Sequence, residues 1–159
     1  MAIPYPPSTQ IATLFGVGRM PLAPGTLASL AALPVGWWLA ILGGWATLLS
    51  AAIWVTLLGI WASGRHAKAV DKKDPSECVI DEVAGQWFAL VPVALTGRLF
   101  HLLALGLAFL FFRVLDILKP WPISRLENYS GGLGIMLDDV AAGIVAGLLV
   151  AAGVAMKLI

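Results

Sequence analysis

The chain has few charged residues and almost no cysteine. Of its 159 residues, 12% are charged and 60% are hydrophobic, whereas soluble domains carry about 25% charged residues. The mean hydropathy is +0.91, and the single cysteine, Cys78, cannot form a disulfide within the chain. A net charge of +1 lacks the basic excess of nucleic-acid-binding proteins, so we expect no nucleic-acid partner. These values predict an integral membrane protein.

The start of the chain also lacks the pattern of a cleaved signal peptide. The segment MAIPYPPSTQIATLFG has no basic stretch that leads directly into an apolar run. We therefore expect no cleaved leader, and membrane insertion should begin with the first apolar helix.

Long apolar runs, in contrast, take up most of the chain. A helix needs about 20 apolar residues to span a bilayer, with a range of about 17–25. The second, fourth and fifth runs reach this length. The first and third are shorter and are compatible with a tilted, partly embedded or buried helix. The five runs cover roughly residues 27–42, 45–62, 80–96, 99–118 and 139–158.

Short turns join these runs in pairs. Gly43 and Gly44 separate the first two runs, and Gly97 and Arg98 separate the next two, so each pair is predicted to form a helical hairpin. Longer polar loops remain at about 63–79 and 119–138. The pattern predicts an all-α, polytopic membrane bundle of about five apolar helices, forming one domain over residues 1–159.

Basic residues are unevenly divided between the two ends of this bundle. Five crossings would place the N-terminus and both long loops on one side, with Arg98 and Lys157 on the other. By the positive-inside rule the loop side is cytoplasmic. The basic residues on that side are Arg19, Arg65, Lys68, Lys72, Lys73, Lys119 and Arg125.

Acidic residues fall only at this cytoplasmic end. Asp116 lies in the last turn of the fourth helix, and the others lie in or beside the two loops. Asp81–Glu82 and Asp138–Asp139 are pairs in apolar surroundings, where an unpaired carboxylate costs several kcal/mol. Ordinary surface charge and helix N-capping are alternative explanations, but a cap needs one acidic residue and each pair has two.

Carboxylates without cysteine or histidine partners favour Mg²⁺ over zinc. Mg²⁺ is usually bound by one or two carboxylates, waters and substrate phosphate oxygens. His66, in the first long loop, and His101, at the far end of the fourth helix, are interpreted as structural or solvated residues. The two acidic pairs are therefore the candidate metal ligands.

The segment GVGRMPLAPGTLASL (16–30) has features suited to an anion. Arg19 precedes the first apolar helix and Thr26 stands near its start, where free N–H groups attract negative charge. Ordinary helix capping explains the same pattern.

The segment FFRVLDILKPWPISR (111–125) combines both signs of charge. Arg113 and Asp116 are i,i+3 neighbours on one helix face, and Lys119 follows before prolines end the helix. The alternative is a structural ion pair with a lysine that reaches the membrane interface. In YSGGLGIMLDDV (129–140), glycines before the second acidic pair allow either close approach to a ligand or a flexible turn.

These segments, with one more, resemble the phosphatidylglycerophosphatase A family. They follow one another along nearly the whole chain, and each is longer and more specific than a single short motif. The matching segments are GVGRMPLAPGTLASL (16–30), DPSECVIDEVAGQW (74–87), FRVLDILKPWPI (112–123) and GGLGIMLDDVAAG (131–143).

The resemblance implies a Mg²⁺-dependent lipid phosphatase of the bacterial inner membrane, multi-pass and with its active site facing the cytoplasm. Its phospholipid substrate would be phosphatidylglycerophosphate, converted to phosphatidylglycerol; the oligomeric state stays open. Cys78 and Gln86 occupy positions that we expect to vary. By matching motif, the catalytic candidates are Asp81, Glu82, Asp116, Asp138 and Asp139, of which all but Asp116 are also candidate metal ligands. The phosphate-binding candidates are Arg19, Thr26, Arg113 and Lys119.

The signatures of three other phosphate-transfer mechanisms are absent. The chain has no DxDx[TV] stretch, no Cys-x5-Arg loop and no DGxxAR…G…D…D spacing. The simplest hypothesis is attack on phosphorus by a metal-activated water, with Arg or Lys stabilising the developing charge and one spare carboxylate as general base.

A small transporter or ion-pathway protein is the alternative class, because it too needs charge within the membrane. Such a protein is expected to carry carboxylates near the bilayer centre and at both faces. The one-sided distribution here favours the enzyme.

Overall fold

The computed structural model describes residues 5–159, and within that range the regular structure is entirely helical. This confirms the predicted all-α class. In chain order the elements are α1 (Pro7–Ala12), the 3-10 helix η1 (Leu14–Arg19), α2 (Pro24–Ala69), α3 (Ile80–Leu95), α4 (Leu102–Leu118), the 3-10 helix η2 (Ile123–Asn128) and α5 (Gly132–Ala155).

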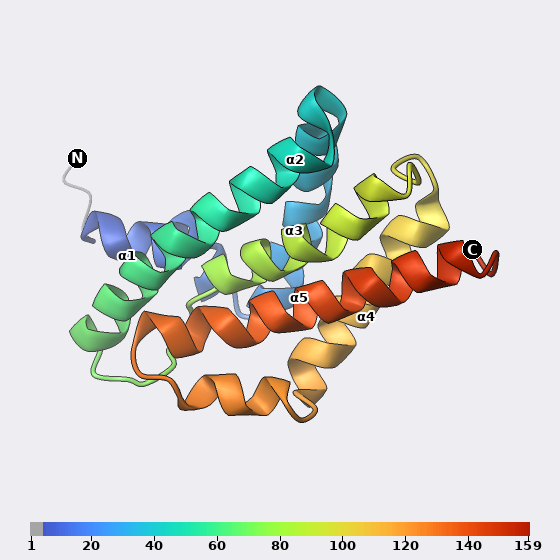
Figure 1. Cartoon of the computed structure of the whole chain (residues 1–159). Coiled ribbons are helices and arrows are strands. Elements are labelled where there is room, and N and C mark those ends of the chain that lie inside the picture. The colour runs from blue at the N-terminus through green and yellow to red at the C-terminus, as the bar shows by residue number, and fades with distance from the viewer. Residues whose placement is uncertain (1–4) are drawn as a thin grey trace.

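A two-glycine break divides α2 into two halves. Gly43 and Gly44 leave helical geometry, and Gly44 has a φ of 73° and a ψ of −169°, which only glycine adopts readily. Figure 1 shows the chain turning back on itself at this point. The first two predicted runs therefore correspond to the two halves of one hairpin. The second half continues to Ala69, so the loop that we predicted from 63 begins only after it.

The predicted second hairpin is formed by α3 and α4. Its turn, residues 96–101, is fixed to α2 because the Trp37 indole donates a 2.8 Å hydrogen bond to the carbonyl of Leu99. The helix bounds lie close to the predicted runs 80–96 and 99–118.

The last helix begins earlier than the sequence indicated. We expected the apolar run from 139, but α5 starts at Gly132. A side chain at Gly132 would collide with the carbonyl of Ile60, and one at Gly134 with the carbonyl of Tyr129. These glycines pack backbone against backbone, so tertiary packing outweighs their low helix propensity. Asp138 and Asp139 consequently lie inside a helix and not in a loop.

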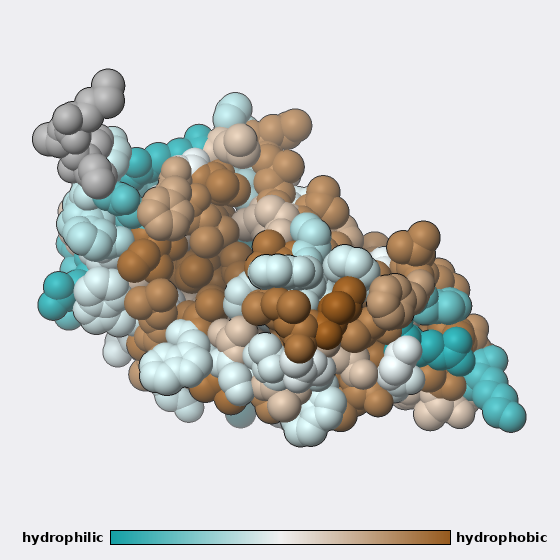
Figure 2. Space-filling model, turned by 90° about the horizontal axis from the view of Figure 1, so that it is seen from above, coloured by the Kyte–Doolittle hydropathy of each residue, from teal (hydrophilic) through white to brown (hydrophobic). Residues whose placement is uncertain are grey.

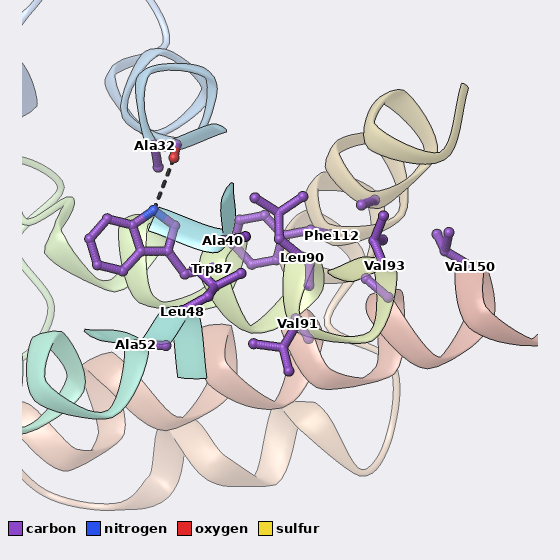
Figure 3. Close-up of a cluster of buried hydrophobic side chains, with 14 of the residues drawn as sticks. Ala32, Ala40, Leu48, Ala52, Trp87, Leu90, Val91, Val93, Phe112 and Val150 are labelled. Carbon is purple, nitrogen blue, oxygen red and sulfur yellow. Dashed lines mark hydrogen bonds between the residues drawn. The ribbon is translucent and has the colours of Figure 1, made fainter. Parts of the chain in front are cut away.

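The core lies where α3 packs against α2, α4 and α5. Figure 3 shows Trp87 of α3, whose indole donates a 2.9 Å hydrogen bond to the carbonyl of Ala32 in α2. Leu90 and Phe112 are fully buried beside it. With 16 residues, α3 is short, and most of its side chains are buried in the bundle, which was one of the alternatives for the third run.

Two helices, α2 and α5, have the length and composition to cross a membrane. The expectation of about five spanning helices is thus met only in part, because α3 and α4 have 16 and 17 residues. Large apolar side chains are nevertheless exposed across the molecule, among them Trp54, which is 71% exposed, and Leu102, which is 83% exposed. In Figure 2 brown apolar residues dominate the visible face, and teal residues gather toward its ends.

Candidate active site

Arg113 of α4 is held between two carboxylates. Its Nη1 donates to Asp116, one turn along the same helix, at 2.7 Å, and to Glu82 near the start of α3. Glu82 also accepts a 2.7 Å hydrogen bond from Ser29 of α2. The three charged side chains are only 11–13% exposed. The pair that we predicted from i,i+3 spacing is therefore part of a buried network that joins three helices.

The start of α2 approaches this network because residue 25 lacks a side chain. A Cβ at Gly25 would collide with Oε1 of Glu82 and would lie 3.6 Å from Nη1 of Arg113. The PGT motif thus allows the backbone of α2 to pack directly on the charged groups.

Lys119 forms a second, similar network. The lysine ends α4 in a left-handed conformation, with a φ of 43°. Its Nζ donates to Asp138 of α5 at 2.6 Å and to Glu127 of η2. Partial burial acts to lower the pKa of the Lys119 amine, but the hydrogen bonds to Asp138 and Glu127 outweigh burial and raise that pKa above its usual range. The amine is therefore charged at neutral pH.

Asp81 and Asp139 lie between these networks. Asp139 is 4% exposed, and it is close enough to Asp81, Asp116 and Glu82 to feel their charges. Carboxylates that are close enough to act on one another repel unless a proton or cation lies between them. Within residues 5–159, neither Asp81 nor Asp139 forms an ion pair.

Capping does not explain the second acidic pair. Residue 131 caps α5, so Asp138 and Asp139 lie two turns inside the helix, beyond the reach of its free N–H groups. Asp81 does sit in the first turn of α3, where Oδ1 accepts a 3.0 Å hydrogen bond from the N–H of Glu82.

Two of the nine predicted site residues stand apart from these networks. Arg19 is exposed and stacks on the ring of Tyr5, with 3.9 Å from its guanidinium carbon to the ring centroid. Thr26 is half-buried in the first turn of α2 and makes no side-chain hydrogen bond within the described residues. The other seven converge where α3 and α5 begin and α4 ends.

Sequence reasoning missed Gln86. We expected this position to vary, yet the side chain is fully buried and neither of its amide atoms has a partner among residues 5–159. It follows Glu82 by one helical turn, so both occupy one face of α3. Nε of Arg113 is likewise buried without a partner. The signal in the sequence was a lone amide in the stretch 83–95, whose other residues are all apolar.

The histidines lie away from the site. His66 is in the last turn of α2 and not in a loop, and it is 1% exposed. Its two ring nitrogens lie 3.1 Å from Thr9 Oγ1 and 3.1 Å from Glu77 Oε1. His66 therefore ties α1 to α2 and to the loop after it, which is a structural role. His101 is at the start of α4, at the other end of that helix from Arg113.

The carboxylates supply only oxygen ligands to a metal. Within residues 5–159, no group of three or more His, Cys, Asp or Glu side chains is arranged to hold a metal ion. Mg²⁺, however, is commonly bound by one or two carboxylates, with waters and substrate oxygens completing the coordination. Asp81 and Asp139, which lack basic partners, have the chemistry for that smaller role.

Comparisons with known proteins identify the family of the chain. The family model for phosphatidylglycerophosphatase A matches residues 10–154. A Bacteroides thetaiotaomicron protein, provisionally named as a phosphatidylinositol-3-phosphatase, is 39% identical over 89% of both chains. Phosphatidylglycerophosphatase A of Escherichia coli is 38% identical over 87% of this chain and 79% of its own, and that of Haemophilus influenzae is 35% identical over 91% and 86%. No solved structure matches the chain.

A helical protein with this charged centre, related along most of its length to phosphatases, is itself a phosphatase. The chain belongs to the phosphatidylglycerophosphatase A family.

Proposed function

We propose that the protein hydrolyses the terminal phosphate of phosphatidylglycerophosphate to give phosphatidylglycerol and inorganic phosphate, with Mg²⁺ as cofactor. The observation that carries this proposal is the position of Asp81 and Asp139. Within residues 5–159 neither carboxylate forms an ion pair. Asp139 lies near enough to Arg113 to act on its charge, and Asp81 is next to Glu82, which pairs with Arg113. The names of the family and of two relatives supply the substrate.

We assign Asp81 and Asp139 as the metal ligands. Sequence reasoning also included Glu82 and Asp138, but Glu82 accepts from Arg113 and Ser29, and Asp138 accepts from Lys119. When bound, Mg²⁺ would neutralise phosphoryl oxygens and activate the attacking water.

The basic residues would bind the phosphoryl group. Arg113 has an unpartnered Nε–H and Lys119 a fixed positive charge, so each could stabilise negative charge that develops on phosphoryl oxygens. Water adds to phosphorus as the bond to the glycerol oxygen breaks. A carboxylate, Asp81 or Asp139, would accept the proton of that water, and a proton must reach the departing glycerol oxygen.

The proposal places the protein in the bacterial inner membrane as a multi-pass bundle, with this site at the cytoplasmic interface. The exposed apolar side chains support contact with lipid. The site lies where α3 and α5 begin and α4 ends. The end of α2, the loop after it and η2 adjoin these helix ends and carry Arg65, Lys68, Lys72, Lys73 and Arg125, which agrees with the positive-inside rule.

Substitution of the two proposed ligands tests the function. We expect Asp81→Asn and Asp139→Asn to lower kcat on short-chain phosphatidylglycerophosphate at least about 100-fold, because an amide binds Mg²⁺ weakly and cannot accept the proton. Asp71→Asn is the matched control: Asp71 is exposed, and its φ of 51° suits asparagine. Phosphate release, measured with and without EDTA, gives the readout.

Helical circular dichroism of each variant separates lost chemistry from lost folding. Activity that persists in EDTA would remove the support for Mg²⁺. Full activity in both variants would overturn the assignment of the site.

A further inference from the structure

A polar pocket of about 200 Å³ adjoins the site. Its wall is formed by the loop after α2, the end of η2 and the first turns of α5. Polar side chains from all three segments line it, and the proposed mechanism uses none of them as a phosphate ligand. They are Lys73, Asp74, Glu127, Tyr129 and Asp138.

Asp138 supplies this pocket with an unused hydrogen-bond acceptor. The residue is 4% exposed, and while its Oδ2 accepts from Lys119, its Oδ1 is buried and has no hydrogen-bond partner in the described part of the chain. A buried carboxylate oxygen without a donor is costly, so such an atom in a pocket wall indicates a donor supplied by a ligand.

The charge of the pocket selects the kind of ligand. Three carboxylates, Asp74, Glu127 and Asp138, outnumber Lys73 even when Lys119 is added. An excess of carboxylates repels phosphate and favours groups that donate hydrogen bonds, such as hydroxyls.

The pocket is also close to the reaction centre. Asp81 lies near enough to feel the charges of Asp74 and Asp138 on the pocket side and of Glu82 in the Arg113 network. Lys119, which the proposed function assigns to phosphate binding, donates to Glu127 and Asp138 of the pocket wall. A phosphate bound at Lys119 would therefore have its attached carbon unit next to the pocket.

We propose that this pocket binds the hydroxyl-bearing polyol unit to which the phosphate is attached, with Oδ1 of Asp138 accepting a hydrogen bond from its hydroxyl. The inference rests on the proposed function. At about 30 Å³ per water, 200 Å³ holds about six waters, which matches the six heavy atoms of a glycerol unit and not a whole lipid. The names of the relatives point to two polyol headgroups, glycerol and inositol, and of these glycerol matches the volume, whereas the larger inositol does not.

Two substrates test the pocket. One is short-chain phosphatidylglycerophosphate, and the other is its analogue with a propanediol linker, which lacks the free hydroxyl. We expect the wild-type protein to favour the hydroxylated substrate by about tenfold or more in kcat/KM, because the analogue leaves Oδ1 unpaired. In Asp138→Ala this ratio should fall to within about threefold of one. Lys72→Ala, which alters an exposed lysine of the same loop outside the pocket, should keep the wild-type ratio.

The ratio separates recognition from a general loss of activity. If Asp138 only positions Lys119 or binds metal, Asp138→Ala lowers kcat/KM equally for both substrates and the ratio stays unchanged, which overturns the proposal. A wild-type ratio near one overturns it as well, while leaving the proposed function intact. Hydrolysis of neither substrate by the wild-type protein contradicts the proposed function itself. Tyr129→Phe, at a half-exposed lining residue, provides a second variant expected to lower the ratio if Asp138→Ala does not fold.

Discussion

Arg113 and Lys119 share one arrangement, in which a single cation lies between two carboxylates from different parts of the chain. Each carboxylate that pairs with a cation becomes less available to a metal. The pairing thus divides six acidic residues into four that hold basic groups and two, Asp81 and Asp139, that are left for chemistry. This division depends on contacts between helices, so sequence reasoning, which grouped the acids as adjacent pairs, could not make it.

Local spacing did predict part of the site. Arg113 and Asp116 are neighbours on any helix, and an ion pair between them was one of the two interpretations of that segment. Ser29, Glu127 and Gln86 were missed, because their roles depend on which helix faces which, and nothing in their own segments specifies that.

Gln86 provides a prediction at the scale of one residue. Gln86→Met replaces a buried amide that lacks partners by an apolar side chain of similar length. We expect the free energy of unfolding to rise by about 1–3 kcal/mol, because the desolvation cost of the amide disappears. We also expect kcat to fall about tenfold, since a costly polar group beside an active site is usually retained for activity.

Leu90→Met, one turn further along α3 and also fully buried, is the control. Leu90→Met should lower the free energy of unfolding by less than about 1.5 kcal/mol and leave kcat unchanged. Denaturant titration and phosphate release measure the two quantities. A Gln86→Met protein that is more stable and equally active would show that the amide has no part in catalysis.

Helix contacts through glycine bring the acidic residues of α3 and α5 together. A Cβ at Gly143 would collide with the carbonyl of Gly85, and a Cβ at Gly85 would lie 2.7 Å from the carbonyl of Asp139. The sequence predicted both helices but not their close approach, and it placed the start of α5 too late because glycines read as a turn.

Gly143→Ala tests this contact. The added methyl group cannot fit against the backbone of α3, so we expect the helices to separate, at a cost of about 1–3 kcal/mol in the free energy of unfolding and with a loss of activity as Asp139 moves from Asp81. Gly106→Ala in α4 is the matched control, because no atom lies within 4 Å of its added Cβ. Gly106→Ala should raise the free energy of unfolding by up to about 1 kcal/mol. Equal stability of the two variants, measured by thermal unfolding, would contradict a tight crossing of α3 and α5.

At the scale of the whole molecule, the composition correctly indicated an apolar helical protein, but the lengths of the apolar runs did not give the number of helices that cross the membrane. A mean hydropathy of +0.91 and exposed tryptophans and leucines agree with a lipid-facing surface. The lengths of the helices vary, however. At 1.5 Å per residue, the 16 residues of α3 give about 24 Å, less than the hydrocarbon core of about 30 Å. A helix that is surrounded by other helices need not be as long as the hydrocarbon core is thick. The length of an apolar run alone therefore does not give the number of membrane-spanning helices.

The orientation of the bundle is the last prediction, and the single native cysteine makes it measurable. Cys78 is buried beside Ser63, with its sulfur 2.9 Å from Ser63 Oγ, and burial raises the pKa of its thiol, so the thiol stays protonated at neutral pH and reacts slowly with maleimides. Lys72→Cys and Arg98→Cys then place exposed thiols at opposite ends of the bundle. If the site faces the cytoplasm, a membrane-impermeant maleimide should label position 98 in intact cells and position 72 only after lysis. Labelling of position 72 from outside would contradict the topology, and with it a reaction on the cytoplasmic face, even if the purified protein hydrolyses the lipid.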